Sequence, residues 1–444
     1  MNPKLLLILL LALILRLISL NQSLWLDEGI QWWAVTTFPL KHLVTEYIKG
    51  DFNPPLYHAI LYLWVKLFGD SEIVLRLPSV LFGLGTVYFV FKIGGLRAAL
   101  LTATAPLLIY YSQEARMYSL AAFTATATLY FLIKKSKIYY LISAIFMLYS
   151  HYLTWLLLPI LFLSAASLTG IVLVTLVPWL PVLWQQLNQG LGAAANPVWA
   201  QLGTLSLQNT LLVPVKFLIG RLPVEPNLFY ALILFLPLSL SAYLLYKSFP
   251  RKLNAKRYSL IAILYAWLFI PLILGALISL KIPLFSYFRF LFVLPAFYLL
   301  LTLGIGRLPQ KLRLYTFLFF LLINLTSSIY YLTSPQFHRE NWRDAVAYIH
   351  SQPAPVVIYS AVRSPFEYYD RGQSLIISET NLDQLINQPE TWYISYAQPI
   401  FDPDNKVHQT LNKLGFEAGE TRHFRGITVT YYQNPKSRQY SMDY

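Results

Sequence analysis

Two adjacent carboxylates follow the first apolar segment of the chain. Asp27 and Glu28 stand in the stretch NQSLWLDEGIQWW, between Trp25 and the pair Trp32 and Trp33. A carboxylate that aromatic rings shield from water has a raised pKa and can serve as a general base. The alternative is a pair of ordinary solvated loop charges. The two acids lie just behind an apolar segment and ahead of a long polar loop. This position favours the first interpretation, a general base at a membrane boundary.

A second candidate group lies in the stretch YYSQEARMYSL. Glu114 is the sole acid between residues 73 and 224, and Arg116 follows two positions later. An ionisable residue at a membrane boundary is costly unless it has a partner or a function. One interpretation is a local surface pair of Glu114 and Arg116. The other is a second carboxylate that converges with Asp27, while Arg116 holds an anionic group.

Basic side chains beside apolar segments form the third group. Lys281 and Arg289 belong to KIPLFSYFRFLFVLPA, and Arg76 lies in SEIVLRLPS. Such side chains either extend along apolar surface to reach water or neutralise a lipid-borne phosphate leaving group, a task that suits Arg and Lys. His151 in SHYLTW is a further candidate, although a lone histidine is more often a structural hydrogen-bonding residue.

Several kinds of site have no sequence support. The chain has no cysteine, which excludes disulfides, thiolate metal ligands and a cysteine nucleophile. It has no glycine-rich phosphate loop, no Gly-x-Ser-x-Gly elbow and no pair of histidines at metal-ligand spacing. Asp27 and Glu114 could share a divalent cation, Mg²⁺ or Mn²⁺, with a substrate phosphate, but oxygen ligands leave no reliable signature. No cofactor is firmly expected.

The elements that must position these residues are membrane helices. Of the 444 residues, 57% are hydrophobic and only 12% are charged, against roughly 25% charged in a soluble domain. Repeated apolar runs predict a polytopic α-helical membrane protein. The net charge of +14 is spread over short loops, which encodes topology rather than a nucleic-acid surface.

The positive-inside rule orients the chain with a cytoplasmic N-terminus in the inner (plasma) membrane. All eight acids before residue 340 then fall on the outer side. We expect about eleven transmembrane helices in a domain of residues 1–335, with an outer loop over 22–74 that contains a surface helix at 54–68. The expected spans are 4–21, 75–94, 98–112, 117–133, 138–151, 153–168, 170–185, 228–247, 258–280, 285–304 and 314–332.

After Tyr331 the composition changes abruptly. HRENWRDAVAYIH predicts an amphipathic helix, and the stretches APVVIYS, SLIIS, TWYISYA and GITVTYY predict strands between polar turns. Residues 336–444 are therefore expected to form a small periplasmic or extracellular α/β domain.

Four segments resemble the membrane glycosyltransferases of the GT-C fold. They are LWLDEG, NPPLYHAILYLWVKLFGDSEIVLRLPSVLFG, YYSQEARMYSL and YFRFLFVLPA. The chain looks closest to the bacterial relatives of dolichyl-phosphate-mannose–protein mannosyltransferases, glycosyltransferase family 39, and to the lipid A aminoarabinose transferases. The likeness spans about residues 4–332 and continues into ENWRDAVAYI. The Trp-Trp-Asp-Tyr-Gly motif of oligosaccharyltransferases does not occur.

The resemblance implies a polyprenyl-phosphate sugar donor and transfer with inversion at the anomeric carbon, on the outer face of the membrane. It implies that Asp27 is the catalytic or substrate-organising carboxylate, with Glu28 beside it. Glu114 falls where relatives place a second acid, although Asp is common there. The donor phosphate would be held by Arg116, Lys281, Arg289 and Arg76. The expected substrate loop comprises Trp25, Pro54, Pro55, Tyr57, His58, Gln113 and Tyr118.

Two other classes stay open at this point. A lipid-linked sugar transporter or flippase would favour charged or broken helices at mid-membrane, whereas most acids here lie at the outer boundary. A binding or scaffold protein would use its external domain to recognise a partner. Within the enzyme class, the donor sugar and the acceptor, whether protein hydroxyls, an envelope lipid or a growing glycan, are undetermined.

Overall fold

The structure is a computed structural model that describes residues 2–194, 200–201, 203–223, 225, 227–249 and 255–435. Its contacts divide the chain into two units. The helical unit comprises Met1–Leu20 and Phe38–Phe337, and the C-terminal unit comprises Asn21–Thr37 and His338–Tyr444. The segment with Asp27 and Glu28, expected in the transmembrane domain, thus belongs to the C-terminal unit.

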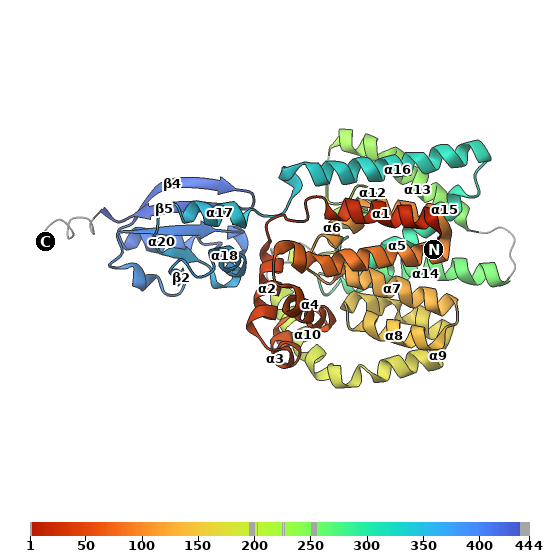
Figure 1. Ribbon diagram of the computed structural model, residues 1–444, viewed down its shortest axis with the longest axis horizontal. Coiled ribbons are helices and arrows are strands. Elements are labelled where there is room, and N and C mark those ends of the chain that lie inside the picture. Colours follow the sequence, from red (N-terminus) through yellow and green to blue (C-terminus); the bar gives the residue numbers. More distant parts are fainter. Residues whose placement is uncertain are drawn as a thin grey trace. The chain divides into compact units, whose positions relative to one another are not determined.

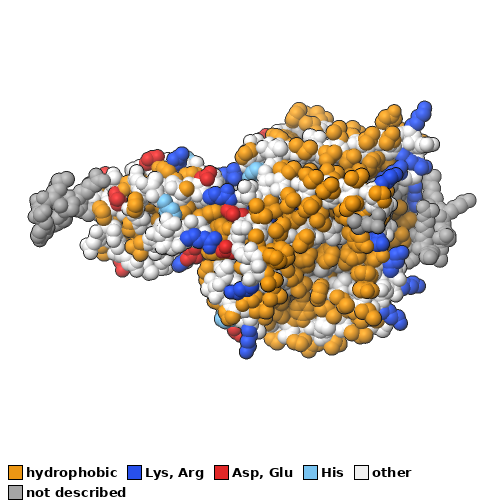
Figure 2. All heavy atoms as spheres, viewed as in Figure 1, with side chains coloured by type: hydrophobic (Ala, Val, Ile, Leu, Met, Phe, Trp, Pro, Cys, Tyr) orange, Lys and Arg blue, Asp and Glu red, His pale blue; other side chains and the backbone are white. Residues whose placement is uncertain are grey.

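The helical unit is built from apolar helices (Figure 1). Within the described residues, five helices are long and apolar enough to cross a membrane, and five shorter apolar helices accompany them. Large apolar side chains are exposed on their outer faces, and basic side chains gather at the end where the N-terminus lies (Figure 2). The unit contains α1 (Pro3–Leu17), α3 (Leu40–Thr45), α4 (Leu56–Phe68), α5 (Glu72–Thr104), α6 (Pro106–Ser112), α7 (Tyr118–Ile133), α8 (Lys137–Leu148), α9 (Leu158–Val174), α10 (Leu180–Ala194), α12 (Leu207–Ile219), α13 (Leu228–Ser248), α14 (Ala255–Ile278), α15 (Leu294–Ile305) and α16 (Gln310–Thr333), with 3₁₀ turns at η1 (Tyr47–Gly50), η2 (Tyr152–Leu157), η3 (Val177–Trp179), η4 (Leu291–Val293) and η5 (Pro335–Phe337).

Most expected spans correspond to helices, but their boundaries differ in informative places. α5 is broken at Gly95, whose φ of 78° interrupts the helix between the expected spans 75–94 and 98–112. α9 is interrupted at Ala165, whose φ of −157° and ψ of 58° are not helical, a few residues before the boundary expected between the spans 153–168 and 170–185. The number of eleven spans is therefore not confirmed.

Several described helices lie where no helix was expected, among them α3, α18 (Ser364–Asp370), α19 (Gln398–Phe401) and α20 (Lys406–Lys413). α2 (Leu26–Thr37) covers the segment with the acid pair, and α12 fills part of the long connection between residues 185 and 228. Ser206 caps α12 by accepting a hydrogen bond from the Asn209 N–H. Gly220 ends it with a φ of 67°, a conformation that glycine adopts without strain.

The C-terminal unit is an α/β fold with one mixed sheet. Its strands are β1 (Val356–Ile358), β2 (Ile376–Ser378), β3 (Glu390–Ser395), β4 (Glu417–Phe424) and β5 (Ile427–Gln433), in the order β2-β1-β3-β5-β4. β1 pairs in parallel with β2 and β3, and β5 pairs antiparallel with β3 and β4. The helices of the unit are α2, α17 (Trp342–Ile349), α18 (Ser364–Asp370), α19 (Gln398–Phe401) and α20 (Lys406–Lys413), with 3₁₀ turns at η6 (Ser360–Val362) and η7 (Leu382–Leu385).

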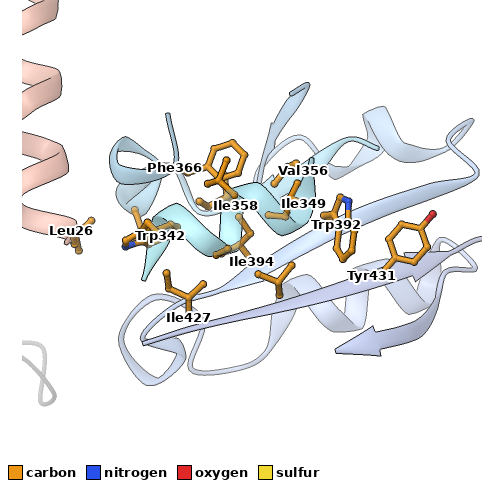
Figure 3. Close-up of a cluster of buried hydrophobic side chains, with 14 residues drawn as sticks. Leu26, Trp342, Ile349, Val356, Ile358, Phe366, Trp392, Ile394, Ile427 and Tyr431 are labelled. Carbon is orange, nitrogen blue, oxygen red and sulfur yellow. The ribbon is translucent and has the colours of Figure 1, made fainter. Parts of the chain in front are cut away.

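All five elements expected in this unit, one helix and four strands, are present as α17, β1, β2, β3 and β5. Their apolar side chains form a core in which Ile349, Ile358 and Ile394 lie between Trp342 and Trp392 (Figure 3). β4 was not expected, because its sequence EAGETRHF is almost entirely exposed and carries no apolar alternation. Leu26 of α2 is buried in the same core, which explains why the segment of the acid pair belongs to this unit.

Candidate functional site

The acid pair lies in the first turn of α2, where carboxylates interact favourably with the helix dipole. Leu26, just ahead of the pair, donates its backbone N–H to the carboxylate of Glu340 over 3.1 Å. Gly29, just behind it, lies so close to the backbone of Pro365 on α18 that an added Cβ would be 2.6 Å from the proline nitrogen. Apolar anchoring and close helix packing therefore fix Asp27 from both sides.

Glu28 and Asp27 have different surroundings. The Glu28 carboxylate is fully buried and lies 3.8 Å from the Arg339 guanidinium, which is itself buried. Asp27 is half-buried. A buried ion pair loses several kcal/mol when one partner is removed, roughly 3–5, so Glu28 has a structural task. Asp27 is the member of the pair that has an accessible surface.

The segment before α2 is fastened to the same part of the C-terminal unit. The Gln22 side chain accepts the backbone N–H of Arg339 over 3.2 Å, and the Ser23 hydroxyl accepts that of Arg343 over 3.2 Å. The Arg343 guanidinium in turn donates to the Asn21 carbonyl over 2.7 Å. These contacts hold the approach to Asp27 against the start of α17.

Glu340 is an acid beside Asp27 that sequence reasoning missed. Its carboxylate accepts hydrogen bonds from the Leu26 N–H, the Trp342 indole at 2.9 Å and the Tyr396 hydroxyl at 2.6 Å. Burial raises the pKa of Glu340, and the negative charge of Asp27 adds to the rise, while the three donors oppose it. The only sequence signal is its place in ENWRDAVAYI, which was interpreted as the start of an amphipathic helix.

In the helical unit, the loop between α6 and α7 carries Gln113, Glu114 and Arg116. The Gln113 amide donates to the carbonyls of Arg16 at 3.0 Å and Ile18 at 2.6 Å. It thereby satisfies carbonyl groups at the end of α1 that have no partner within the helix. Gln113 and Glu114 are fully buried, and Arg116 is partly buried. The expected substrate residue Gln113 is thus also a link between α1 and this loop.

Asp51 and His58 form a second polar group in the helical unit. The His58 ring lies 3.2 Å from the Asp51 carboxylate, and the Asn53 amide donates to the same carboxylate over 2.9 Å. Burial alone would raise the pKa of Asp51, but His58 and the positive charge of Arg116 hold it well below its usual range. His58 was expected in the substrate loop, whereas its partner Asp51 was not selected as a site residue.

His151 lies within electrostatic range of two arginines, Arg289 and Arg116. Burial, together with the positive charges of Arg289 and Arg116, lowers its pKa to about 3. Its ring nitrogen accepts the backbone N–H of Leu153 over 3.2 Å, as a helix cap. The histidine is therefore neutral at physiological pH, and its structural interpretation accounts for its contacts.

Arg289 lies in the loop between α14 and η4. Its guanidinium donates to the Pro283 carbonyl over 3.1 Å and stands 5.6 Å from the centre of the Phe288 ring. Tyr118 packs edge-on against the same ring, with centroids 5.7 Å apart. Burial lowers the pKa of Arg289. Within the described residues, no carboxylate lies at ion-pair distance from it.

Arg221 is a further cation that sequence reasoning missed. Its guanidinium donates to the Tyr110 hydroxyl over 3.1 Å and lies 4.9 Å from the centre of that ring. Tyr110 raises the pKa of Arg221, and Tyr287 and Glu114 add to the rise. Arg221 therefore lies within electrostatic range of Glu114, the acid predicted from the sequence. Among the residues that the structure describes, Arg221 has no carboxylate at ion-pair distance.

Arg221 was missed because it follows a helix that was not expected. Gly220 ends α12, and an added Cβ there would lie 2.9 Å from Pro106 at the start of α6. The close approach of Gly220 brings Arg221 to Tyr110 on α6. No local sequence feature of GRLPVEP distinguishes Arg221 from an ordinary loop arginine.

The other predicted residues have mainly structural contacts. Arg76 is fully buried and donates to the Leu20 carbonyl over 2.8 Å. The Tyr57 hydroxyl bonds the Ser79 hydroxyl over 3.0 Å. Lys281 is exposed just after α14. Three further residues are Pro54, which is buried, Pro55, which precedes α4, and Trp25, which packs against the core of the C-terminal unit.

The expected metal site stays a prediction. No group of three or more Asp, Glu, His or Cys side chains that could hold a metal ion occurs in the described part of the chain. Asp27 belongs to the C-terminal unit and Glu114 to the helical unit.

Two solved structures are similar to this chain. The first is ArnT from Cupriavidus metallidurans bound to undecaprenyl phosphate, with a TM-score of 0.57 and 13% sequence identity over 96% of this chain and 97% of that chain. The second is ArnT from the same organism in the apo state, with a TM-score of 0.54 and 14% identity over the same shares. No protein-family model and no curated protein sequence matches the chain.

The similarity extends over almost the whole of both chains, so it includes the C-terminal unit as well as the helices. ArnT is a lipid A aminoarabinose transferase of the GT-C fold. The GT-C fold expected from the sequence is therefore confirmed. By its fold, this chain is a multi-pass membrane protein of the GT-C type, similar to ArnT.

Proposed function

We propose that this chain is an integral membrane glycosyltransferase that moves a sugar from a polyprenyl-phosphate donor to an acceptor on the outer face of the membrane, with inversion. One observation carries the proposal. A GT-C fold like that of ArnT, which was crystallised with undecaprenyl phosphate, here contains two loop guanidiniums, Arg221 and Arg289, that have no carboxylate at ion-pair distance within the described residues. A lipid phosphate supplies the missing anion.

The chemistry needs a base and a set of cations. The acceptor hydroxyl oxygen attacks the anomeric carbon, and the bond from that carbon to the phosphate oxygen breaks with its electron pair on the phosphate. The transition state resembles an oxocarbenium ion, as in glycosyl transfer generally. Asp27 takes the hydroxyl proton as general base, or orients the acceptor, because it is the half-buried member of the acid pair.

The leaving phosphate is assigned to Arg221, Arg289 and Arg116. Arg side chains bind phosphate with two parallel hydrogen bonds, and the aromatic surroundings of Arg221 and Arg289 reduce competition from water. Arg76 is left out because it is fully buried and bonded to a carbonyl. Lys281 is left out because it is exposed and no contact places it beside the others.

Glu28 and Glu114 are assigned supporting tasks. Glu28 is buried against Arg339 and holds α2 in place. The negative charge of Glu114 acts on Arg221 at a distance, without an ion pair, so Glu114 is assigned an electrostatic task rather than a chemical one. A divalent cation shared by Asp27 and Glu114 is kept as a hypothesis that a chelator tests.

The test uses the full-length protein in lipid nanodiscs with a panel of radiolabelled polyprenyl-phosphate sugars and membrane extract. We expect label to appear in a product, which identifies donor and acceptor together, and a parallel sample with chelator reports on the metal. Asp27→Asn is expected to abolish transfer, while the matched variant Asp383→Asn, at an exposed site on η7, keeps it. Full transfer by a folded Asp27→Asn variant, or movement of the labelled donor across the membrane with no product, would contradict the proposal.

The orientation of the chain has its own test. The basic end of the helical unit carries the N-terminus, which the positive-inside rule assigns to the cytoplasm. The absence of cysteine allows single-cysteine labelling on an otherwise unreactive background. We expect Lys281→Cys to react with an impermeant maleimide in intact cells and Lys137→Cys to react only after permeabilisation. The reverse pattern would overturn the assignment.

A further inference from the structure

A cavity of about 270 Å³ lies in the C-terminal unit, and the proposed reaction does not use it. It is formed where parallel strands end. Tyr359 follows β1 directly, Glu379 follows β2 directly, and Phe401 and Asp402 come after β3. The cavity therefore opens at the carboxyl edge of the parallel part of the sheet.

The strand order makes this edge a favoured place for a ligand. The chain leaves β1 toward β2 and leaves β3 toward β5 and β4, which lie on the opposite side. Connections that leave adjacent parallel strands in opposite directions open a crevice between them, and open α/β sheets bind their ligands there. Topology thus points to a binding site independently of the side chains that line it.

The lining side chains determine which ligands fit. Glu379, Asp402 and Asp404 contribute three carboxylates, and Lys406 contributes one ammonium group, which pairs with Asp404 at 3.1 Å. The formal charge of the lining is therefore negative. An acidic ligand is disfavoured, and a ligand with hydroxyl or ammonium donors is favoured.

The start of α20 does not offer an anion site. The Asp402 carboxylate, which is almost fully buried, accepts the backbone N–H groups of Lys406 at 2.7 Å and Val407 at 3.2 Å. The donors that attract phosphate to other helix N-termini are thus occupied by a carboxylate of the chain itself. Nucleotides and sugar phosphates are excluded as favoured ligands.

Glu379 provides an acceptor that is held in position. One of its carboxylate oxygens, Oε2, accepts the Ser360 N–H at 2.9 Å and the Ser360 hydroxyl at 3.1 Å. Within the described residues, the other oxygen, Oε1, accepts no hydrogen bond from the protein. The rings of Tyr359 and Phe401 supply apolar surface to the same cavity.

We propose that this cavity binds one neutral or amino-bearing sugar residue of the acceptor. The choice of a sugar among ligands rich in hydroxyl donors rests on the proposed glycosyltransferase function. The volume lies just below the range of about 300–1,000 Å³ that holds drug-sized ligands, so it suits a single polar ring. The sugar places its apolar face on Tyr359 or Phe401 and donates a hydroxyl to Glu379.

The test measures binding at equilibrium, which needs no turnover. Full-length protein in nanodiscs is titrated with methyl mannoside, methyl glucosaminide, glucuronate and Ca²⁺, with ligand-observed NMR for the sugars and calorimetry for the metal. We expect saturable binding of the first two probes and at least tenfold weaker binding of glucuronate. Glu379→Gln is expected to weaken binding about tenfold, and the matched variant Glu420→Gln, exposed on β4, to leave it unchanged.

A second variant, Thr410→Phe, fills the cavity from α20 without removing a charge, and we expect it to abolish sugar binding. It tests the cavity independently in case Glu379→Gln fails to fold. The proposal is overturned if neither neutral nor amino sugar binds, if both variants bind as tightly as the wild type, or if only Ca²⁺ or glucuronate saturates. Sugar transfer is assayed on the same preparations. If the wild type transfers label but does not bind the sugar probes, this inference alone is refuted. If the wild type binds the sugar probes but transfers no label, only the proposed function is refuted.

Discussion

Gly29→Ala is expected to reduce the rate of sugar transfer while donor binding stays unchanged. An added Cβ would lie 2.6 Å from the nitrogen, 2.7 Å from Cδ and 2.8 Å from Cα of Pro365. Optimal contacts between carbon atoms are about 3.5–4.0 Å, so each of the three separations is too short by roughly 1 Å. Two of the three atoms belong to the backbone of α18, and no side-chain rotation relieves them.

The energy balance makes activity a more sensitive readout than stability. Overpacking of this kind costs about 1–3 kcal/mol, while replacing glycine by alanine inside a helix gains about 0.8–1 kcal/mol. The net loss of unfolding free energy is then about 0–2 kcal/mol. The helices α2 and α18 must separate by about 1 Å, and a displacement of that size at a reacting group costs about 100-fold in rate.

The assay compares the initial rate of label transfer and the KM for the donor in nanodiscs. Gly50→Ala is the matched control, because nothing lies within 4 Å of a Cβ at that position. We expect Gly29→Ala to lose about 10- to 100-fold in rate with KM within a factor of two, and Gly50→Ala to behave as the wild type. A rate for Gly29→Ala within twofold of the wild type, or an equal loss in Gly50→Ala, would refute the view that α2–α18 packing positions Asp27.

Three further predictions concern other parts of the chain. Arg221→Lys keeps the charge but loses the planar pair of donors, so we expect the donor KM to rise about tenfold in the same assay with the melting temperature unchanged; an unchanged KM contradicts the phosphate assignment. Leu26→Ala removes a buried side chain of the C-terminal core, and we expect the unfolding free energy to fall by about 2–4 kcal/mol in denaturant titrations. The pKa of Asp51 lies below its usual range in the folded protein, so its contribution to stability is present above the unfolded value of about 3.9 and is lost as pH falls toward the folded value. Melting temperatures measured from pH 5 downward should therefore show the advantage of the wild type over Asp51→Asn shrinking below about pH 4, and a constant difference would contradict the lowered pKa of Asp51.

Much of the fold follows from the sequence because it depends on local pattern. Apolar runs of about 20 residues predict membrane helices, since lipid leaves the backbone no other partner. Short runs rich in β-branched and aromatic residues between polar turns predict strands such as β3 and β5 for the same local reason. β4 was not predicted because its side chains are almost all exposed and show no apolar pattern. Its place in the sheet depends on backbone pairing with β5.

The candidate site could be predicted only in part. Asp27 and Glu114 are recognisable from sequence because an acid is rare and costly in an apolar chain. Arg221 is not recognisable, because a loop arginine is common and its contact with Tyr110 depends on the close packing of Gly220 against Pro106. Such packing joins segments more than a hundred residues apart, which no local pattern encodes.

The sequence by itself determined that the chain is a helical membrane protein with a C-terminal α/β domain, because hydropathy and side-chain pattern are properties of each segment alone. Only the tertiary structure decided the roles within the acid pair. Leu26 is buried in the C-terminal core and Glu28 is paired with Arg339, so the helix orientation leaves Asp27 as the accessible carboxylate. The burial of Glu28 and the exposure of Asp27 depend on contacts between α2 and residues beyond 338. Such contacts join distant parts of the chain, so the local sequence does not determine them.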